Sequence, residues 1–322
     1  MDSTADPSYP HIFRRHESDH EPDCEPYRKA GPEIPVVDLR ALDPGRLAEA
    51  CRVWGIFRLA NHGIPPTLSN RILDRARLIL SEPFEDKRTR FGGGPVSYFW
   101  GTPAVGKRVR SVNWVEGLHI PLARLRSGEE PGFGSSSFRC LVDEYVRHMA
   151  RIARELFNAL TVDLKLDSVQ STSHFSEPDA ILRVYRYPRR PNACHNFGLE
   201  AHSDSSLLSI LNQDEVGGLQ ILREGRWINV APISDMLIVN IGDMMQAISD
   251  NEYMSVEHRV LASSSKERIS LCYFAYPSED GLISSSRYKP FTYKDFKAKV
   301  QEDIEATGFK IGLDRFRITD PN

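Results

Sequence analysis

Hydrophobic positions divide the chain into a helix-rich first half and a strand-rich second half. In the first half, apolar residues recur at helical spacing in three segments, 44–54, 67–80 and 138–162, which are predicted helices. Short apolar runs at 34–39 and 55–63 are predicted strands between and before them. The residues that precede the first run, 1–33, are polar and without periodicity, so we expect a flexible N-terminal arm.

The second half consists of short runs rich in β-branched and aromatic residues, separated by turns that contain Gly, Pro and Asp. The predicted strands span residues 181–187, 207–211, 218–222, 226–230, 236–241 and 269–276. Many short strands separated by such turns indicate a sandwich or barrel rather than a parallel α/β sheet. The last predicted element is a helix at 293–307, capped by Gly308.

Composition excludes several classes of partner and compartment. With 322 residues and a formal net charge of -3, the chain lacks the excess of Lys and Arg that nucleic-acid binding needs. The five cysteines are an odd number without a C-x-x-C pair, which argues against a disulfide framework and favours a reducing compartment. No apolar leader or membrane-length apolar run is found, so we expect a cytoplasmic protein that does not enter membranes.

The first chemically informative pattern is AHSD at 201–204. On a strand, residues i and i+2 point to the same side, so His202 and Asp204 are expected to face one interior point. An imidazole and a carboxylate supply two ligands for a divalent transition metal, and a facial triad needs one more histidine. His258, on a later predicted strand, is the candidate third ligand. Because H-x-D alone also occurs by chance, this hypothesis needs support from residues later in the chain.

Arg268 and Ser270 form the complementary half of the pattern. They lie ten residues after His258 as R-x-S, with both side chains on one face of a predicted strand. Arginine binds a carboxylate in a bidentate manner, and serine adds a hydroxyl donor. A dicarboxylate can then chelate a metal at one end and contact Arg268 at the other. R-x-S alone is typical of an ordinary surface pair, so the ordered combination carries the prediction.

Several motifs resemble those of the plant-type 2-oxoglutarate/Fe(II)-dependent dioxygenases, over residues 34–316. They are WGIF at 54–57 with NHG at 61–63, RYP at 186–188, GLEAHSD at 198–204, DEVGGLQ at 214–220, VNIGD at 239–243 and SVEHRV at 255–260. The resemblance implies a mainly β fold with flanking helices and a double-stranded β-helix (jelly roll) core. Residues 34–165 would be the N-terminal dioxygenase region, and residues 166–322 the jelly-roll catalytic domain with its C-terminal helix.

The resemblance also implies an enzyme that binds a metal and an organic co-substrate. The residues it assigns are His202, Asp204 and His258 as ligands of Fe(II), and Arg268, Ser270 and Tyr187 as contacts of 2-oxoglutarate. Ascorbate is the reductant we expect. One position departs from the family pattern: Tyr185 stands where Asn usually contacts the metal-proximal end of 2-oxoglutarate.

Two segments resemble the gibberellin 2-oxidases, especially the branch that acts on C20 precursors. These are YFWGTP at 98–103 with LHIP at 118–121, and VQEDI at 300–304 with GFKIGL at 308–313. The implied substrate is a gibberellin-like acid, and the implied reaction is its 2β-hydroxylation, which inactivates the hormone. The alternatives are oxidation of an auxin, a phenylpropanoid or an alkaloid on the same scaffold, and a small-molecule receptor without catalysis.

The remaining notable side chains have ordinary structural interpretations. His62 and His119 are expected to be core histidines, since a facial triad already has its three ligands. Gly242–Asp243 is expected to be a tight turn, with the aspartate bonded to the backbone. Arg189 and Arg190 are interpreted as a solvated loop, with attraction of a substrate carboxylate as the alternative. Core packing is favoured over pocket lining for five aromatic residues, Tyr98, Trp100, Trp114, Phe274 and Tyr276.

Overall fold

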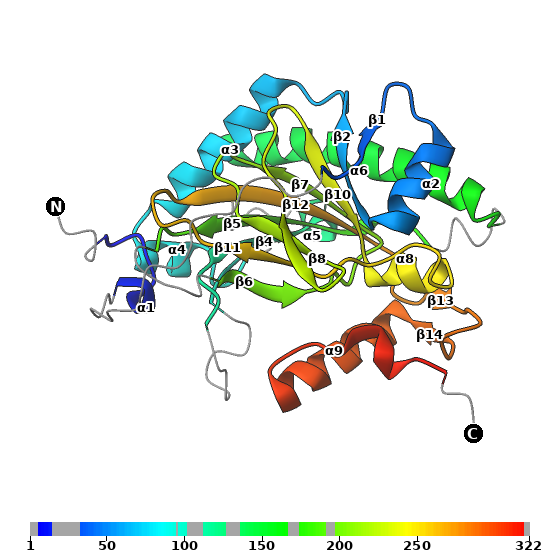
Figure 1. The fold of residues 1–322 in the computed structure, drawn as a ribbon. Helices are drawn as coiled ribbons and strands as arrows, with labels where there is room; N and C mark the ends of the chain where they lie inside the picture. Colours follow the sequence, from blue (N-terminus) through cyan, green and yellow to red (C-terminus); the bar gives the residue numbers. More distant parts are fainter. Residues whose placement is uncertain are drawn as a thin grey trace.

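Two β-sheets face each other at the centre of the molecule (Figure 1). This computed structural model describes residues 6–14, 33–94, 96–101, 112–126, 136–166, 174–190 and 197–318. The strands are β1 (Val36–Asp38), β2 (Ile56–Ala60), β3 (Ser97–Trp100), β4 (Glu116–Pro121), β5 (Ser176–Tyr187), β6 (Phe197–His202), β7 (Leu208–Gln213), β8 (Leu219–Arg223), β9 (Arg226–Asn229), β10 (Leu237–Ile241), β11 (His258–Leu261), β12 (Arg268–Tyr276), β13 (Leu282–Ile283) and β14 (Phe291–Thr292). The larger sheet has the order β1-β2-β10-β7-β12-β5-β4-β3, and the smaller has the order β6-β11-β8-β9. The predicted jelly-roll core is confirmed.

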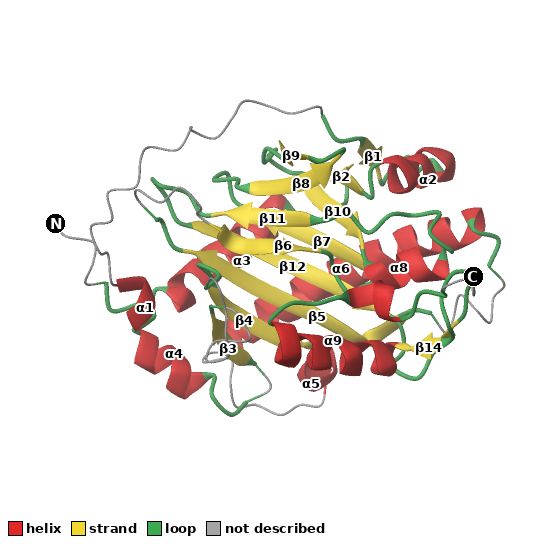
Figure 2. Cartoon of the chain, turned by 60° about the horizontal axis from the view of Figure 1, so that its bottom comes forward, coloured by secondary structure: helices red, strands yellow, loops and turns green. Residues whose placement is uncertain are grey.

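Two helices, α3 and α6, cover the outer face of the larger sheet, opposite the smaller sheet (Figure 2). The helices are α1 (His11–Arg14), α2 (Pro44–Val53), α3 (Pro66–Leu80), α4 (Phe84–Arg90), α5 (Leu122–Arg126), α6 (Ser136–Asp163), α8 (Asp243–Ile248) and α9 (Tyr293–Thr307). Both α3 and α6 contact β12, and every residue of β12 is buried, because the strand is covered on its two faces. No helix in the described part of the chain is long and apolar enough to cross a membrane.

The predicted helices at 44–54 and 293–307 agree with α2 and α9 to within one residue, and local contacts explain where they begin and end. At the start of α9, the Thr292 hydroxyl accepts a hydrogen bond from the Asp295 N–H, and the Asp295 carboxylate accepts one from the Thr292 N–H. The helix ends at Gly308, whose φ of 86° lies in the left-handed region that favours glycine. The Asp43 carboxylate caps α2 by accepting from two backbone N–H groups of its first turn.

The short elements between α3 and α6 were not predicted. Helix α4 has the sequence FEDKRTR, which has no helical apolar stripe. It is held instead by Lys87, a fully buried residue whose ammonium donates to the carboxylate of Glu116 on β4 and to the Leu80 carbonyl oxygen. Strands β1 to β4 pair into the same sheet as β5, β7, β10 and β12, so the expected N-terminal region and catalytic domain share one sheet.

Part of the predicted N-terminal arm is packed against the body of the protein. Ser8 and Phe13 are buried, and the Ser8 carbonyl oxygen accepts from the Lys87 ammonium at 2.7 Å. The Phe13 ring lies 4.3 Å from the Trp114 ring, measured between centroids. The prediction of a flexible arm is therefore wrong for residues 6–14, because these contacts come from residues far along the chain. Residues 15–32 lie outside the described residues.

Candidate active site

The three residues predicted as metal ligands lie together at the ends of two strands. His202 is the last residue of β6 and His258 the first of β11, and the strand register places them opposite each other. Oδ1 of Asp204 lies 3.7 Å from Nε2 of His202, and Oδ2 of Asp204 lies 3.8 Å from Nε2 of His258. One candidate ligand atom of each residue lies within 4.8 Å of the others. Two imidazoles and one carboxylate in this arrangement fit the donor set of a facial triad for Fe(II).

Asp204 reaches this position differently from the prediction. Strand β6 ends at His202, so the aspartate is not on the strand. Its carbonyl oxygen accepts from the Asp243 N–H at 2.8 Å, and its Oδ2 accepts from the Asn240 amide at 2.8 Å. The carboxylate is therefore oriented by β10 and the start of α8 rather than by strand alternation. Asn240 was not identified from the sequence, because its contact joins residues that are distant along the chain.

Backbone carbonyl groups orient both imidazole rings. Nδ1 of His202 donates to the Glu200 carbonyl oxygen at 2.7 Å, and Nδ1 of His258 donates to the Val256 carbonyl oxygen at 3.1 Å. With the proton on Nδ1, each Nε2 carries a free lone pair, and each Nε2 lies near the Asp204 carboxylate. Such contacts fix the tautomer and the ring direction that a metal ligand requires.

At neutral pH, His202 and Asp204 are in the protonation states that bind a metal cation. Burial lowers the pKa of His202 to about 4, and the neighbouring His258 imidazole acts in the same direction, so the His202 ring is neutral. Burial alone would raise the pKa of Asp204, but the two imidazoles and the Asn240 amide lower it to about 2. The site therefore offers a neutral imidazole and an ionised carboxylate, the forms in which these groups bind metals.

Arg268 and Ser270 lie on β12, across the interior from the two histidines. Arg268 is 1% exposed; its guanidinium donates to the Ser270 hydroxyl at 3.0 Å and to the Gln213 side-chain oxygen at 2.8 Å. The same guanidinium lies over the Tyr187 ring, 4.9 Å from its centroid. Nε of Arg268 has no hydrogen-bond partner among the described residues. A buried cation with an unsatisfied donor fits a bound carboxylate.

All six residues assigned from the sequence line one cavity of about 50 Å³. The cavity is lined from the smaller sheet by His202 and His258, from the following turn by Asp204, and from the larger sheet by Tyr187, Arg268, Ser270, Tyr185, Cys272 and Phe274. Its volume corresponds to a few water molecules, far below the several hundred Å³ of a typical small-molecule pocket. Side chains that line it must therefore move when ligands enter.

Tyr185 occupies much of the space beside this cavity. The strand register places it between Gly117 of β4 and Ser270 of β12, two residues with little or no side chain. A Cβ atom at Gly117 would lie 2.0 Å from the Val184 carbonyl oxygen and 2.7 Å from the Phe99 ring, so these two close approaches require glycine. The Tyr185 ring stacks on Tyr187 and meets Phe99 edge-on. An aromatic ring is thus packed at the position where the resemblance leads us to expect Asn.

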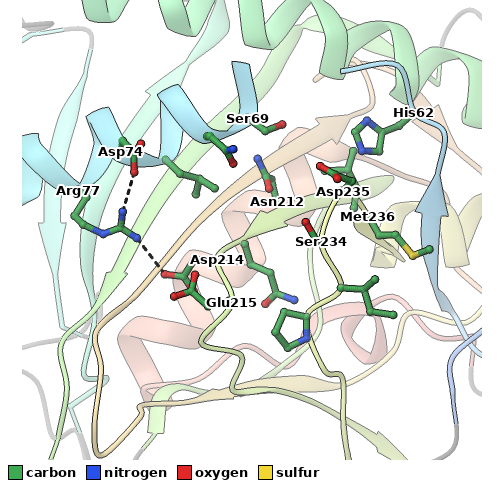
Figure 3. A pocket seen from close by; sticks show the side chains of 16 residues that line it. His62, Ser69, Asp74, Arg77, Asn212, Asp214, Glu215, Ser234, Asp235 and Met236 are labelled. Carbon is green, nitrogen blue, oxygen red and sulfur yellow. Dashed lines mark hydrogen bonds and ion pairs between the residues drawn. The ribbon is translucent and has the colours of Figure 1, made fainter. Parts of the chain in front are cut away.

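A larger cleft of about 340 Å³ lies between α3, the end of β7 and the start of β10 (Figure 3). Three of its charged side chains interact: Arg77 donates to Asp74 at 3.0 Å and lies 3.6 Å from Asp214. His62 lines the cleft, and its Nδ1 accepts from the Ile64 N–H, as expected of a satisfied histidine. Among the described residues, the only group that could hold a metal lies in the smaller cavity.

The interpretation of Gly242–Asp243 as a tight turn is wrong. Asp243 begins helix α8, and its carboxylate accepts from the Lys310 ammonium and from the Ser255 hydroxyl, both at 2.8 Å. Gly242 is required by a close approach, because a Cβ atom there would lie 2.1 Å from the Ser206 carbonyl oxygen. The aspartate binds side chains distant along the chain, which its immediate neighbours did not indicate.

The five aromatic residues fall into two groups. Tyr98, Trp100 and Trp114 contact the N-terminal segment or α4 rather than the cavity. Phe274 lines the cavity, and Tyr276 stacks on Tyr293 of α9. Core packing is confirmed for Tyr98, Trp114, Phe274 and Tyr276, although Phe274 also lines the cavity. Trp100 is half-buried.

Comparison with known families agrees with this geometry. Residues 178–277 match the 2OG-Fe(II) oxygenase superfamily. Residues 34–128 match the N-terminal family described as non-haem dioxygenase in morphine synthesis. The first match spans both histidines, the aspartate and the Arg268–Ser270 pair, so it covers the whole cavity lining that the sequence predicted.

Plant relatives match over most of the chain. Gibberellin 2-beta-dioxygenase 6 of Oryza sativa subsp. japonica is 38% identical over 306 residues, which cover 88% of this chain and 85% of the relative. Gibberellin 2-beta-dioxygenase 8 of Arabidopsis thaliana is 37% identical over 304 residues, covering 88% and 87%. Jasmonate-induced oxygenase 1 of Arabidopsis thaliana is 32% identical, covering 87% of this chain and 74% of its own.

Solved structures share the fold. The crystal structure of JOX2 in complex with 2OG, Fe and JA has a TM-score of 0.77 at 29% identity and covers 91% of each chain. The dioxygenase for auxin oxidation of rice has a TM-score of 0.73 at 24% identity. Fe(II) and 2-oxoglutarate are the metal and co-substrate of the family these matches define. The chain therefore belongs to the 2OG-Fe(II) oxygenase superfamily and is a dioxygenase of that family.

Proposed function

We propose that this dioxygenase hydroxylates a gibberellin at the 2β position and thereby inactivates the hormone. The observation that supports the proposal is a set of four gibberellin 2-beta-dioxygenases that are 33–38% identical to the chain over at least 88% of its length. The residues of the cavity are consistent with the reaction, since they supply a metal-binding set and a carboxylate-binding set.

The assignment of roles follows the geometry of the cavity. His202, Asp204 and His258 would hold Fe(II), with Asn240 fixing the carboxylate of Asp204. When bound, Fe(II) and 2-oxoglutarate would activate molecular oxygen, which is the oxidant: one oxygen atom would enter the substrate C–H bond as a hydroxyl group and the other would enter the succinate formed from 2-oxoglutarate with loss of carbon dioxide. Ascorbate would be the reductant that keeps the iron in the Fe(II) state.

The other cavity residues bind and shield the co-substrate. Arg268 and Ser270 would bind its distal carboxylate, while the face of Tyr187 covers the guanidinium. Gln213 holds the second guanidinium nitrogen and so restricts Arg268 to one orientation. Both Arg268 and Ser270 are fully buried, so water is excluded from the carboxylate contact.

The test is succinate formation by the purified protein with Fe(II), ascorbate and 2-oxoglutarate, with and without a panel of gibberellins. We expect at least one gibberellin to stimulate succinate formation and to gain one oxygen atom, measured by mass spectrometry. Stimulation should be lost in His202→Ala. Succinate formation that no gibberellin stimulates would contradict the substrate assignment and leave the oxygenase activity standing.

A second candidate substrate class is another plant acid on the same scaffold. The structure of JOX2 in complex with 2OG, Fe and JA, together with the two jasmonate-induced oxygenases at 32% identity, supports testing jasmonic acid. Auxin is tested beside it because the rice auxin oxidase shares the fold. A phenylpropanoid or alkaloid substrate, or a receptor without turnover, would require that none of these acids stimulates succinate formation.

We also propose that the enzyme works in the cytoplasm. Among the described residues, Cys51, Cys140 and Cys272 form no disulfide, which is consistent with a reducing compartment. Imaging of a tagged full-length chain tests the location, and a signal confined to another compartment would contradict it.

A further inference from the structure

A second guanidinium faces the interior beside the cavity. Arg183 lies on β5, two residues before Tyr185 and four before Tyr187, and both tyrosines line the cavity. Strand alternation therefore places the Arg183 side chain on the same side of the sheet, facing the cavity. Its cross-strand neighbour on β12 is Cys272, which also lines the cavity. The alternating positions can be read from the sequence, but they gave no reason to assign a ligand-binding role to Arg183.

The surroundings of Arg183 are aromatic. The guanidinium carbon lies 5.6 Å from the centroid of the Phe274 ring. Tyr276 follows Phe274 by two residues on the same face of β12 and stacks on Tyr293 at 5.0 Å. A ligand that contacts the guanidinium at this place therefore has apolar side chains around the rest of its body.

Two neutral side chains hold Arg183 in place: the His119 imidazole and, through a side-chain hydrogen bond, Tyr185. The Arg183 Nε donates to Nδ1 of His119, 3.1 Å away on the neighbouring strand β4. Burial lowers the pKa of His119 to about 4, and the guanidinium groups of Arg183 and Arg124 act in the same direction. At neutral pH the imidazole is uncharged, so it orients the arginine without neutralising its charge.

The described residues supply no counter-ion for Arg183. Asp204 acts on it electrostatically but forms no ion pair with it, and that carboxylate belongs to the candidate metal-binding set. The buried guanidinium of Arg186, on the same strand, is by contrast paired with the carboxylates of Glu116 and Glu267. A partly buried cation among aromatic rings is costly unless an anion joins it. The missing anion is then supplied by a ligand.

This anion differs from the distal carboxylate of 2-oxoglutarate. Arg183 pairs with Cys272, which lies four residues beyond Arg268 on β12, a separation of about 13 Å along the strand. A five-carbon dicarboxylate that binds Arg268 extends toward the histidines, whereas Arg183 starts from a backbone position further along the sheet. Two carboxylates from two different molecules therefore fit the two guanidinium groups.

We propose that Arg183, oriented by His119, binds the carboxylate of the substrate and makes the enzyme selective for apolar carboxylic acids over their neutral forms. The inference rests on the proposed function, since it identifies the substrate class of the same cavity. In this proposal, Arg183 alone accounts for the preference of the enzyme for the carboxylate form of its substrate over neutral forms.

Binding is measured rather than turnover, by titration calorimetry on the full chain with Fe(II) and 2-oxoglutarate in the absence of oxygen. The probes are gibberellins, jasmonic acid and indole-3-acetic acid, each beside its methyl ester. We expect at least one acid to bind wild-type protein about 10- to 100-fold more tightly than its ester, the value of a charge-assisted hydrogen bond at a buried site. In Arg183→Gln this advantage should fall to about threefold or less.

Two variants control for loss of structure. Arg183→Lys keeps the charge but not the planar fork, so it should retain the preference for the acid with weaker binding. Arg189→Gln removes a guanidinium just beyond the end of β5 and should leave the preference unchanged. Arg183→Gln should still bind 2-oxoglutarate, which shows that the Arg268 end of the cavity is intact.

The proposal is overturned if no acid binds wild-type protein better than its ester, or if the advantage persists in Arg183→Gln. Its failure is distinguishable from failure of the proposed function. An acid preference that depends on Arg183, for jasmonic acid but for no gibberellin, supports the carboxylate site and rejects the gibberellin assignment. The same preference without any succinate formation supports the site and rejects hydroxylation.

Discussion

The ammonium of Lys310 donates to the carboxylate of Asp243 at 2.8 Å and so connects the C-terminal segment to the start of helix α8. The same ammonium donates to the carbonyl oxygen of Ser203 at 2.6 Å, between His202 and Asp204. The backbone N–H of Asp243 donates to the carbonyl oxygen of Asp204. One lysine after the last long helix thus fixes the turn that carries two candidate metal ligands.

Replacement of Lys310 by Met should weaken metal binding. The turn at Ser203 loses its anchor, and residues that orient metal ligands typically change affinity by about 10- to 100-fold when removed. Calorimetric titration of the apo-protein with Co(II) measures the change. Lys299→Met is the matched control, because this lysine of α9 pairs only with the nearby Glu302 in the described contacts; equal affinity in both variants would show that Lys310 does not position the ligands.

Replacement of Glu116 by Gln should destabilise the protein strongly. Its buried carboxylate pairs with Lys87 at 2.8 Å and with Arg186 at 3.0 Å. Removing the negative charge leaves buried Lys87 without a carboxylate and Arg186 with Glu267 as its remaining partner, which costs about 3–5 kcal/mol of unfolding free energy. Denaturant unfolding measures the loss, with exposed Glu85→Gln as the control, expected to change stability by about 0.5 kcal/mol or less. A small effect of Glu116→Gln would contradict the buried pairing.

Replacement of Tyr185 by Asn, the residue that the family resemblance leads us to expect there, should lower the unfolding free energy by about 3 kcal/mol. The substitution empties the space between Phe99 and Tyr187, and loss of a buried aromatic side chain costs about 3–5 kcal/mol when a cavity remains. Tyr185→Phe keeps the ring and should cost far less in the same denaturant experiment. If the Asn variant is as stable as wild type, the ring is not packed as described.

Stability should decrease between pH 7 and pH 5 partly through His119. Its pKa is about 4 in the folded protein, against about 6.5 in an unfolded chain. The unfolded state therefore binds a proton at pH 5 that the folded state does not, and this favours unfolding by up to about 2 kcal/mol. His119→Gln should have a shallower pH dependence in denaturant titrations. An unchanged slope would mean that the folded histidine titrates normally.

Features encoded by neighbouring residues could be predicted from the sequence. The capping pair Thr292–Asp295 and the terminal Gly308 determine α9 locally, and the H-x-D pattern with R-x-S identified the cavity. Alternation of side chains on β12 placed Arg268 and Ser270 on one face, as found.

Features that depend on distant contacts could not be predicted. Asp204 leaves the strand because Asn240 and Asp243 bind it, and α4 forms around buried Lys87 without an apolar stripe. Gln213 contacts Arg268 only because β7 pairs with β12. In each case the deciding partner lies in another strand or helix, and pattern periodicity carries no information about such pairings.

His202, Asp204 and His258 are expected to hold the metal, and every other role assigned to the cavity depends on them. Titration of the purified chain with Co(II) tests this most directly, with wild type beside His202→Ala and His258→Ala. We expect one metal ion per wild-type chain and at least about 100-fold weaker binding in each variant, because each loses a direct ligand. Wild-type affinity in both variants would contradict the assignment, since the ion would then be bound elsewhere.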